Sequence, residues 1–347
     1  MEQNNSTSTK KNKITIRQVA ELAGVTIGTV SHVINGTAPI SPETTARVHE
    51  AISTLNYVPN ITAKSLRSKS SKVVGFLIPN LNNNFYSRIS STFINLAFEN
   101  GFIVQILGYE YSLEKELQAI NSLASNSVDI VIILNGHGDE DGIRRLIDAK
   151  KSVILADRVS DIEGVNCLYF DNSKVIHEAV ALLKKKGYQR IGFLSEPLAL
   201  TNVQERFTAY RAALESFGYV FREEDIFICE NFQLDAMFNG YHYMREILQN
   251  SNKRELPDAF IATSDLLAIG AIKAFRESGL HVPGDVGIIS YDNLDIASFV
   301  DPGLTTIEQN QALMGTELFN LVKAISEKEV VKEHIVLPQK LIIRESC

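Results

Sequence analysis

The pattern of hydrophobic and polar positions divides the chain into two regions. Between residues 15 and 55, apolar side chains recur every three or four positions in three short segments, which is the period of amphipathic helices. From Val73 onward, apolar runs alternate with helical stretches, and this alternation predicts parallel sheets with right-handed crossovers. We therefore expect a small all-α domain followed by a larger α/β body.

Each of the three short segments carries its own helix signals. Thr15, Thr26 and Ser41 stand at the expected N-caps, and Gln18 completes a capping box with Thr15. Glycines follow the first two helices, where a left-handed C-cap is expected. The apolar faces of the three helices are expected to form one small core.

The second of these helices is short and rich in small and β-branched residues. A helix, a tight turn containing glycine and a second short helix form a helix-turn-helix, whose second helix lies in the DNA major groove. A three-helix module that binds another protein is the alternative on spacing alone. The residues expected to face outward are Thr26, Ile27, Gly28, Thr29, Ser31 and His32.

The distribution of charge favours the nucleic-acid interpretation. Residues 1–72 hold nine lysines and arginines against four acids, a net charge of +5, whereas the whole chain carries −7. The remaining residues therefore carry −12. A basic N-terminal region attached to an acidic body is typical of a module that binds a polyanion. If charge alone is considered, a solvated basic tail is the alternative.

Cysteine usage and hydropathy predict a cytoplasmic protein. Cys167, Cys229 and Cys347 lie far apart, without the spacing of a metal site or a disulfide framework. The polar start of the chain has no apolar run behind its charges, and no later run approaches the roughly 18 apolar residues of a membrane span. We expect no membrane segment and no metal.

The stretch ITIRQVAELAGVTIGTVSHVING, with ISPETTARVHEAISTLNYVPNITAKSL after it, resembles the headpiece of the LacI/GalR family of bacterial transcriptional regulators. The resemblance implies that Ile27, Gly28 and His32 read bases. Gly28 stands where many relatives place a long polar side chain, and His32 replaces their usual arginine, so the operator sequence does not carry over. The resemblance also implies phosphate contacts by Thr15, Thr26, Ser31, Asn35 and Tyr57.

The segment NITAKSLRSKSSK follows Pro59. Asn60 can cap a single helical turn that brings Ala63 and Leu66 to one side, but the segment has too few apolar residues to fold alone. On the residues alone, a plain interdomain linker is the alternative. In the family this segment is the hinge helix, and the resemblance implies that Asn60 and Leu66 contact DNA, with Leu66 entering the minor groove.

The larger body is predicted to contain two sets of four buried strands, and hence two lobes. The strands are expected within residues 72–80, 101–109, 128–136, 151–158, 190–197, 226–231, 259–265 and 286–293. The helices between and after them are expected over residues 86–100, 112–125, 173–186, 203–217, 235–249, 265–278 and 311–326.

Polar side chains follow most of the predicted strands, where open parallel sheets bind their ligands. Together with nearby aromatic residues they suit a polyhydroxylated ligand, although each polar residue alone is equally explained as a helix cap or turn residue. The polar strand ends are Asn80, Asn135, Asp157, Arg158, Ser195, Glu196, Ser264, Asp265, Asp292 and Asn293.

The family resemblance continues through this body, in motifs such as ERFTAYRAAL and TSDLLAIGAIKAFRESGLHVPGDVGIISYDN. The corresponding core in the family is similar to periplasmic sugar-binding proteins. The resemblance implies that Arg206 holds an effector, and a purely structural Arg206 paired with an acid is the alternative. The other effector residues that it implies are Phe85, Tyr86, Asn135, Asp157, Phe232, Ser264 and Asp292.

These observations predict four parts in the chain. A helix-turn-helix headpiece with a disordered N-terminal tail is expected over residues 1–59, and a hinge helix with its linker over 60–72. The remaining chain is expected to form a two-lobed core that resembles a periplasmic binding protein. Residues 73–170 and 311–337 are assigned to its first lobe, and residues 171–310 and 338–347 to its second.

Sequence motifs of common catalytic sites are absent from the chain. It has no P-loop, no G-x-S-x-G and no H-E-x-x-H, and its seven histidines are scattered. We predict a homodimeric transcription regulator, without a cofactor and not an enzyme, that binds pseudo-palindromic double-stranded DNA. A small-molecule effector controls it; a sugar is preferred by analogy, and a sugar phosphate or a nucleoside also fits. A solute-binding protein and a sugar-converting enzyme are the alternatives.

Overall fold

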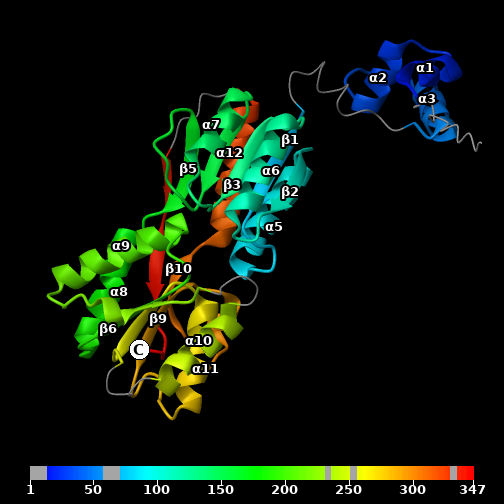
Figure 1. The fold of residues 1–347 in the computed structure, drawn as a ribbon. Coiled ribbons are helices and arrows are strands. Elements are labelled where there is room, and N and C mark those ends of the chain that lie inside the picture. Colours follow the sequence, from blue (N-terminus) through cyan, green and yellow to red (C-terminus); the bar gives the residue numbers. More distant parts are fainter. Residues whose placement is uncertain (1–13, 58–70, 231–235, 251–255, 329–333) are drawn as a thin grey trace, which may run out of the picture. The chain divides into compact units, whose positions relative to one another are not determined.

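The chain forms two compact units, Met1–Ser71 and Lys72–Cys347. The computed structural model describes residues 14–57, 71–230, 236–250, 256–328 and 334–347. The helices of the first unit are α1 (Ile16–Ala23), α2 (Ile27–Asn35) and α3 (Pro42–Leu55) (Figure 1).

The caps of these three helices confirm the sequence prediction. Thr15 and Gln18 form the complete capping box of α1, and the side chains of Thr26 and Ser41 cap α2 and α3. The glycines that end α1 and α2 both have φ of +63°, a conformation that side chains with a Cβ avoid. Local sequence therefore fixes where each helix begins and ends.

The core of the first unit is small. Val30 is the buried residue of α2, so this helix depends on one fully enclosed side chain and on half-buried neighbours. A core of this size stabilises only marginally. Its buried residues are Val19, Ala20, Ala23, Val30, Val48 and Ala51, and Ile16, Val25, Val33, Ile34, Ile52, Leu55 and Tyr57 pack against them.

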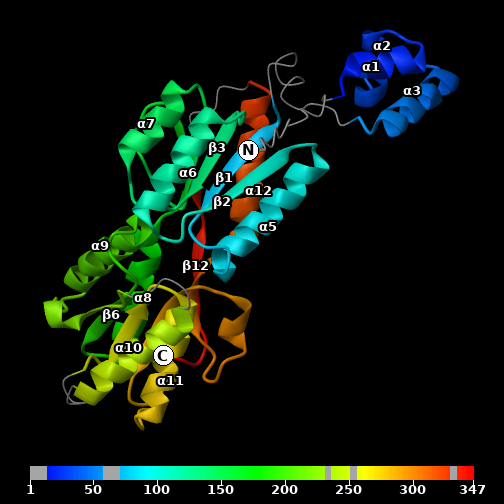
Figure 2. The ribbon, with the colours of Figure 1, turned by 45° about the vertical axis from the view of Figure 1, so that its right-hand side comes forward.

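The second unit contains two six-stranded sheets (Figure 1 and Figure 2). The first has the order β11-β5-β4-β3-β1-β2, with β1 (Val73–Ile78), β2 (Ile103–Gly108), β3 (Ile130–Leu134), β4 (Ser152–Ala156), β5 (Val165–Phe170) and β11 (His334–Leu337). The second has the order β12-β10-β9-β8-β6-β7, with β6 (Ile191–Ser195), β7 (Ile226–Ile228), β8 (Ala259–Ala262), β9 (Gly287–Asp292), β10 (Thr305–Gln309) and β12 (Gln339–Ile342).

Strand pairs in both sheets are parallel, except that β12 runs antiparallel to β10. The chain passes between the sheets three times: after β5, after β10, and between β11 and β12. We call each sheet with its helices a lobe. No helix in the described part of the chain combines the length and the hydropathy of a membrane-spanning segment.

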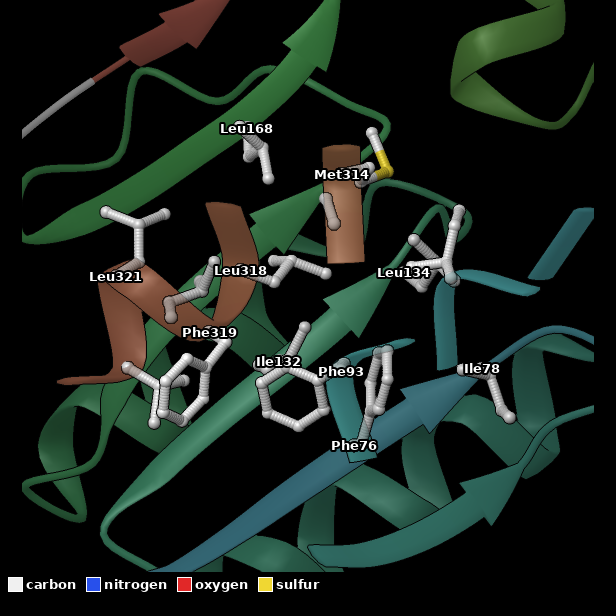
Figure 3. Close-up of a cluster of buried hydrophobic side chains, with 14 of the residues drawn as sticks. Phe76, Ile78, Phe93, Ile132, Leu134, Leu168, Met314, Leu318, Phe319 and Leu321 are labelled. Atoms are coloured by element: carbon white, nitrogen blue, oxygen red, sulfur yellow. The ribbon is translucent and has the colours of Figure 1, made fainter. Parts of the chain in front are cut away.

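Helices cover both faces of each sheet, which explains the continuous apolar strands. In β1, Phe76 packs toward α5 and α12, whereas Leu77 joins the cluster under α6 and α7. Figure 3 shows the first cluster, in which Leu318 of α12 points toward Ile132 of β3. The helices of the first lobe are α5 (Asn84–Glu99), α6 (Leu113–Ser125), α7 (Glu140–Asp148) and α12 (Gln311–Ser326).

The second lobe repeats this arrangement. Ile288 of β9 packs toward α10 and α11, and Ile289 packs toward α8 and α9 on the other face. The helices of this lobe are α8 (Asn172–Lys186), α9 (Thr201–Ser216), α10 (Ala236–Asn250) and α11 (Asp265–Glu277).

The predicted strands and helices are all present, but the expectation of four strands in each lobe was wrong. The strands β5, β10, β11 and β12 and the helix α7 are additional. Polar residues interrupt β5 and β10, as in TTIEQ, and β11 and β12 have only four residues each. Segments this short or this polar carry no clear periodicity.

Candidate nucleic-acid interface and ligand pocket

The first turn of α2 forms an exposed surface. Ile27 is 37% exposed although it is a large apolar residue, and Gly28 and His32 are exposed on the same helix. Thr26 accepts a hydrogen bond from the Thr29 backbone N–H at 3.1 Å. The backbone N–H groups at a helix start also carry a positive partial charge that suits phosphate.

Gly28 has free space where a side chain would stand. A Cβ built at this position meets only Thr26 Oγ1, at an ordinary 3.5 Å, and its φ is not in the left-handed region. Packing within this unit therefore does not require glycine. A mid-helix glycine costs about 1 kcal/mol relative to alanine, so the residue has a cost without a local structural benefit.

Other predicted DNA contacts are held by hydrogen bonds to residues nearby in the sequence. His32 Nδ1 lies 2.9 Å from Thr37 Oγ1, which orients the ring. Asn35 Nδ2 donates to the backbone carbonyl of Ser31 at 2.7 Å and to Ser31 Oγ at 3.3 Å, so the Asn35 side chain lies along α2. Thr15 is engaged in its capping box, at the start of α1.

Three predicted site residues lie outside the described residues. These are Asn60 and Leu66 of the predicted hinge and Phe232 of the predicted pocket. Tyr57, at the end of the described first unit, is half-buried and packs against the small core.

A pocket lies between the two lobes of the second unit. Its volume is about 30 Å³, far below the roughly 300 to 1,000 Å³ of ligand-binding clefts, so opening or side-chain movement is needed to admit a metabolite. It brings together five predicted residues, Phe85, Tyr86, Arg206, Ser264 and Asp292. The other lining residues are Asn83, Tyr111, Glu196, Leu200, Asn202, Val203 and Thr263.

Helix starts and strand ends position these side chains. Asn83 caps α5 by accepting from the Phe85 backbone N–H at 2.9 Å, which places Phe85 and Tyr86 in its first turn. Their rings meet edge to face at 5.3 Å between centroids. Ser264 caps α11, and Asp292 ends β9 with a φ of +105°. The pocket thus lies at the carboxyl ends of the strands, as predicted for an open parallel sheet.

Arg206 is the central cation of the pocket and is only 4% exposed. It donates from Nη1 to the Thr263 carbonyl at 2.7 Å and from Nη2 to Gln309 Oε1 at 2.9 Å. Its guanidinium lies 4.3 Å from the centroid of the Tyr291 ring. Neutral partners therefore hold Arg206 in a fixed orientation.

Asn135 and Asp157 contact the lining residues from behind. Asn135 Nδ2 donates to the Tyr86 hydroxyl at 3.2 Å, and Asp157 Oδ2 accepts from Asn202 Nδ2 at 2.7 Å. Both residues have left-handed φ values, of +59° and +58°, directly after β3 and β4. Their side chains fix the orientation of two residues that line the pocket.

Buried and half-buried carboxyl groups lie near Arg206. Burial raises the pKa of Asp157 to about 6, against the attraction of Arg206 and the hydrogen bond from Asn202. Burial and then the charge of Asp157 raise the pKa of Glu205 to about 7. Burial also raises the pKa of Glu196 above its ordinary value. The environment of the pocket is therefore unfavourable to additional negative charge.

Asp292 of the pocket forms a pair with a further buried acid, Asp265. Burial raises the pKa of Asp265 to about 6, although Ser290, Thr306 and the Leu294 backbone N–H donate to its carboxylate. The pKa of Asp292 lies well above its ordinary value because of burial and then the charge of Asp265. Among the described residues, no cluster of side chains has the composition of a metal site.

The sequence-based prediction did not include several lining residues. Asn202 and Val203 lie about one helical turn before Arg206 on α9, so helical spacing from Arg206 was a usable signal. Glu196 was noted as a strand end without being assigned to the site. No sequence pattern indicated Tyr111, which follows β2 in a loop and has φ of +55°.

Two family models match the chain. Residues 15–60 match the bacterial regulatory proteins of the lacI family, and residues 180–347 match a periplasmic binding protein-like domain. Catabolite control protein A of Priestia megaterium is 30% identical over 339 residues, which cover 96% of this chain and 99% of that protein.

Solved structures match over nearly the full length. The lac repressor dimer bound to operator and the anti-inducer ONPF has a TM-score of 0.82 at 27% identity, covering 96% of this chain and 98% of that chain. The complex of the transcriptional regulator CelR with cellobiose has a TM-score of 0.70 at 30% identity, covering 96% of this chain and all of that chain (100%). The exposed α2 and the pocket between two lobes are consistent with these matches. The chain therefore belongs to the LacI family of bacterial regulatory proteins.

Proposed function

We propose that this protein is a cytoplasmic transcriptional repressor of a metabolic operon, and that a small effector, a sugar, controls its affinity for DNA. The observation that carries the proposal is the pairing, in one chain, of an exposed recognition-type helix with a pocket lined from two lobes. It is a binding function without catalysis, which agrees with the relatives named as regulators and repressors.

The first unit is the DNA-binding headpiece in this proposal, over residues 1–59, with a hinge over 60–72. Ile27, Gly28 and His32 face base edges from the major groove. The missing side chain of Gly28 allows the backbone of α2 to approach the duplex. Phosphate contacts come from Thr15, Thr26, Ser31, Asn35 and Tyr57, and hinge contacts from Asn60 and Leu66.

The effector lies between a lobe of residues 73–170 and 311–337 and a lobe of residues 171–310 and 338–347. Phe85 and Tyr86 cover the apolar face of a sugar ring, while Arg206 and Asp292 bind its hydroxyls. Ser264 adds a further polar contact, and Phe232 completes the aromatic set. Asn135 and Asp157 position Tyr86 and Asn202.

A homodimer places two headpieces on a pseudo-palindromic operator, as in the lac repressor dimer bound to its operator. Strand β2 lies at the edge of its sheet with Ile103 46% exposed and Ile106 37% exposed, and Phe98 of α5 is 80% exposed. An apolar edge strand needs a cover. We place the interface between the two copies over this surface.

In this proposal, closure of the two lobes is coupled to the hinge, so that effector binding in the pocket changes the affinity of the headpiece for DNA. A ligand that contacts both lobes favours the closed arrangement, in which Thr201 and Asn202 of α9 bond to Asn135 and Asp157. A shift of the first lobes across the dimer then changes the spacing of the two hinges.

Binding to fragments of the promoter region of its own gene tests the DNA part of the proposal. The intact dimer should retard such fragments at low salt, with an affinity that falls steeply as salt rises. A chain without residues 1–72 should not retard them. Equal retardation by the shortened chain would contradict the proposal.

Thermal unfolding in the presence of sugars and nucleosides tests the ligand part. A bound effector raises the melting temperature. The Arg206→Ala variant should lose this rise while keeping its operator affinity. The control is Arg211→Ala, an exposed arginine on the same helix, α9, which should keep the rise. Whether the effector weakens or strengthens operator binding follows from repeating the retardation assay with it.

A further inference from the structure

Three buried polar atoms in the pocket have no hydrogen-bond partner among the described residues: Glu196 Oε2, Asn202 Oδ1 and Arg206 Nε. All three side chains line the pocket and are 6%, 5% and 4% exposed. Buried polar atoms are nearly always paired in folded proteins. We therefore expect a bound ligand to form hydrogen bonds with these three atoms. Two of them, Glu196 Oε2 and Asn202 Oδ1, are acceptors, and Arg206 Nε is a donor.

Hydroxyl groups match this pattern, because each one both donates and accepts. A molecule with neighbouring hydroxyls can donate to Glu196 and Asn202 and accept from Arg206. A phosphate dianion or an ionised carboxylate only accepts hydrogen bonds. Such a group can accept from Arg206 Nε but cannot donate to Glu196 Oε2 or Asn202 Oδ1, and it brings a negative charge toward the Glu196 carboxyl.

Arg206 is also poorly arranged to bind an anion. Each of its two terminal nitrogens already donates one hydrogen bond, to the Thr263 carbonyl and to Gln309 Oε1, so the planar fork that grips phosphate in two places is partly engaged. Glu196 and Asp292 line the same pocket, and both are carboxylic acids. An anionic ligand would meet two acids beside one partly engaged cation.

The backbone of Glu196 holds its side chain in this place. Its N–H donates to Thr263 Oγ1 at 3.2 Å, and its carbonyl accepts from Ser195 Oγ at 2.7 Å. Glu196 directly follows β6, at the carboxyl end of the second sheet. The backbone that carries the Glu196 side chain is therefore held at the pocket wall.

We propose that Glu196 is a specificity-determining residue, which makes the pocket select an uncharged polyhydroxylated molecule over the phosphorylated or carboxylated form of the same molecule. This inference rests on the proposed function and narrows its ligand class. Glu196 and Asn202 provide acceptors for two ligand hydroxyls, and Arg206 Nε donates to a third oxygen.

Calorimetric titration of the full-length protein with matched sugars tests the inference. The probes are glucose, galactose and ribose, each beside its terminal phosphate ester and its terminal carboxylic acid form. The sugar that binds should bind at least about tenfold more tightly than its own two anionic forms, since each anion brings a negative charge into a pocket lined by Glu196 and Asp292. This comparison uses the wild-type chain and needs no variant.

The Glu196→Gln variant tests the residue itself. The substitution keeps the side-chain volume but removes the negative charge. The affinity for the uncharged sugar should therefore fall about tenfold. The ratio of this affinity to the affinity for the phosphate ester should fall by a similar factor. Glu215→Gln is the matched control, because Glu215 is exposed on α9 and outside the pocket. It should leave both affinities unchanged. Melting curves and operator retardation check that both variants are folded.

The outcomes separate this inference from the proposed function. Tighter binding of a phosphate or acid form to the wild-type chain overturns the inference and leaves effector binding standing. An unchanged preference in folded Glu196→Gln also overturns it. Intact operator binding with no response to any of the probes counts against the sugar effector and against this inference together.

Discussion

Asn202 Nδ2 donates a hydrogen bond of 2.7 Å to Asp157 Oδ2, and this contact joins the two lobes. Asp157 follows β4 of the first sheet, and Asn202 lies in the first turn of α9 in the second lobe. The preceding residue, Thr201, donates to Asn135 Oδ1 at 3.2 Å, so consecutive residues of α9 contact the ends of β3 and β4. Separation of the lobes must break both contacts.

Breaking the Asp157 contact should weaken effector binding, because the closed arrangement loses a buried hydrogen bond to a carboxylate. Such bonds contribute about 1.5 to 3 kcal/mol, so Asn202→Ala should lower the affinity at least about tenfold. Calorimetry with the effector measures it. In a double-mutant cycle with Asp157→Ala, the two losses should be clearly less than additive. Additive losses would show that the contact does not act as a unit. Thr208→Ala, on the exposed face of α9, is the control.

The raised pKa of Asp157 predicts how folding stability depends on pH. Its folded pKa of about 6 exceeds the unfolded value, so the folded state binds this proton more tightly. Stability is therefore lost as pH rises from about 4 to about 6, and stays level above that range. A shift of about two units corresponds to roughly 3 kcal/mol as an upper estimate.

The Asp157→Asn variant removes this titration. The unfolding free energy of this variant, relative to that of the wild type, should therefore increase as pH rises from about 4 to about 6. Urea unfolding at several pH values measures this difference. Glu205 extends the window toward pH 7, because burial and then the charge of Asp157 raise its pKa to about 7. A stability difference that is constant across this range would contradict the assignment.

The parts of the fold with strong local signals were predictable from the sequence. The capping box of Thr15 and Gln18 and the glycine ends of α1 and α2 are local features, and the structure reproduces them. The strand β12 was not predictable in this way. It pairs antiparallel with β10, which precedes it by about thirty residues, and its burial alternates only weakly. Tertiary pairing, rather than its own residues, makes it a strand.

The site residues can be divided in the same way, into those that the local sequence indicates and those whose role depends on tertiary contacts. Arg206 and Asp292 stand in motifs that can be read along the chain, and the structure places both in the pocket. The roles of Asn135 and Asp157 depend on which residues the opposite lobe brings near, which a linear pattern does not contain. Tyr111 reaches the pocket from a loop for the same reason. Helical spacing alone would have added Asn202.

Gly28→Ala should separate headpiece stability from DNA affinity. The added Cβ has free space within the headpiece, so the variant should gain up to about 1 kcal/mol of unfolding free energy. Operator affinity should fall, since the methyl group stands on the surface proposed to face DNA. Urea unfolding and fluorescence anisotropy measure the two effects. Unchanged or improved operator affinity would contradict close approach of the backbone at this position.

Gly36→Ala is the matched control for that experiment. Gly36 also has free space around it, but its φ of +63° strains any residue with a Cβ. This variant should lose about 1 kcal/mol of stability. Opposite signs for the two glycines would show that backbone conformation, and not packing, decides the stability effect at each position.

The exposed edge of the first sheet predicts how the protein assembles. Ile103 on β2 and Phe98 on α5 are 46% and 80% exposed, and β2 is an edge strand of the first sheet among the described residues. Ile103→Lys places a charge on this surface and should shift the dimer to monomers in sedimentation experiments. Operator affinity should fall with it, because one headpiece then contacts one half-site. Effector affinity per chain should stay within about threefold of the wild-type value, because the pocket lies within one chain.

The control is Val220→Lys, which changes an exposed residue of the second lobe and should leave the protein dimeric. A monomeric wild-type protein, or a dimeric Ile103→Lys variant, would place the interface elsewhere.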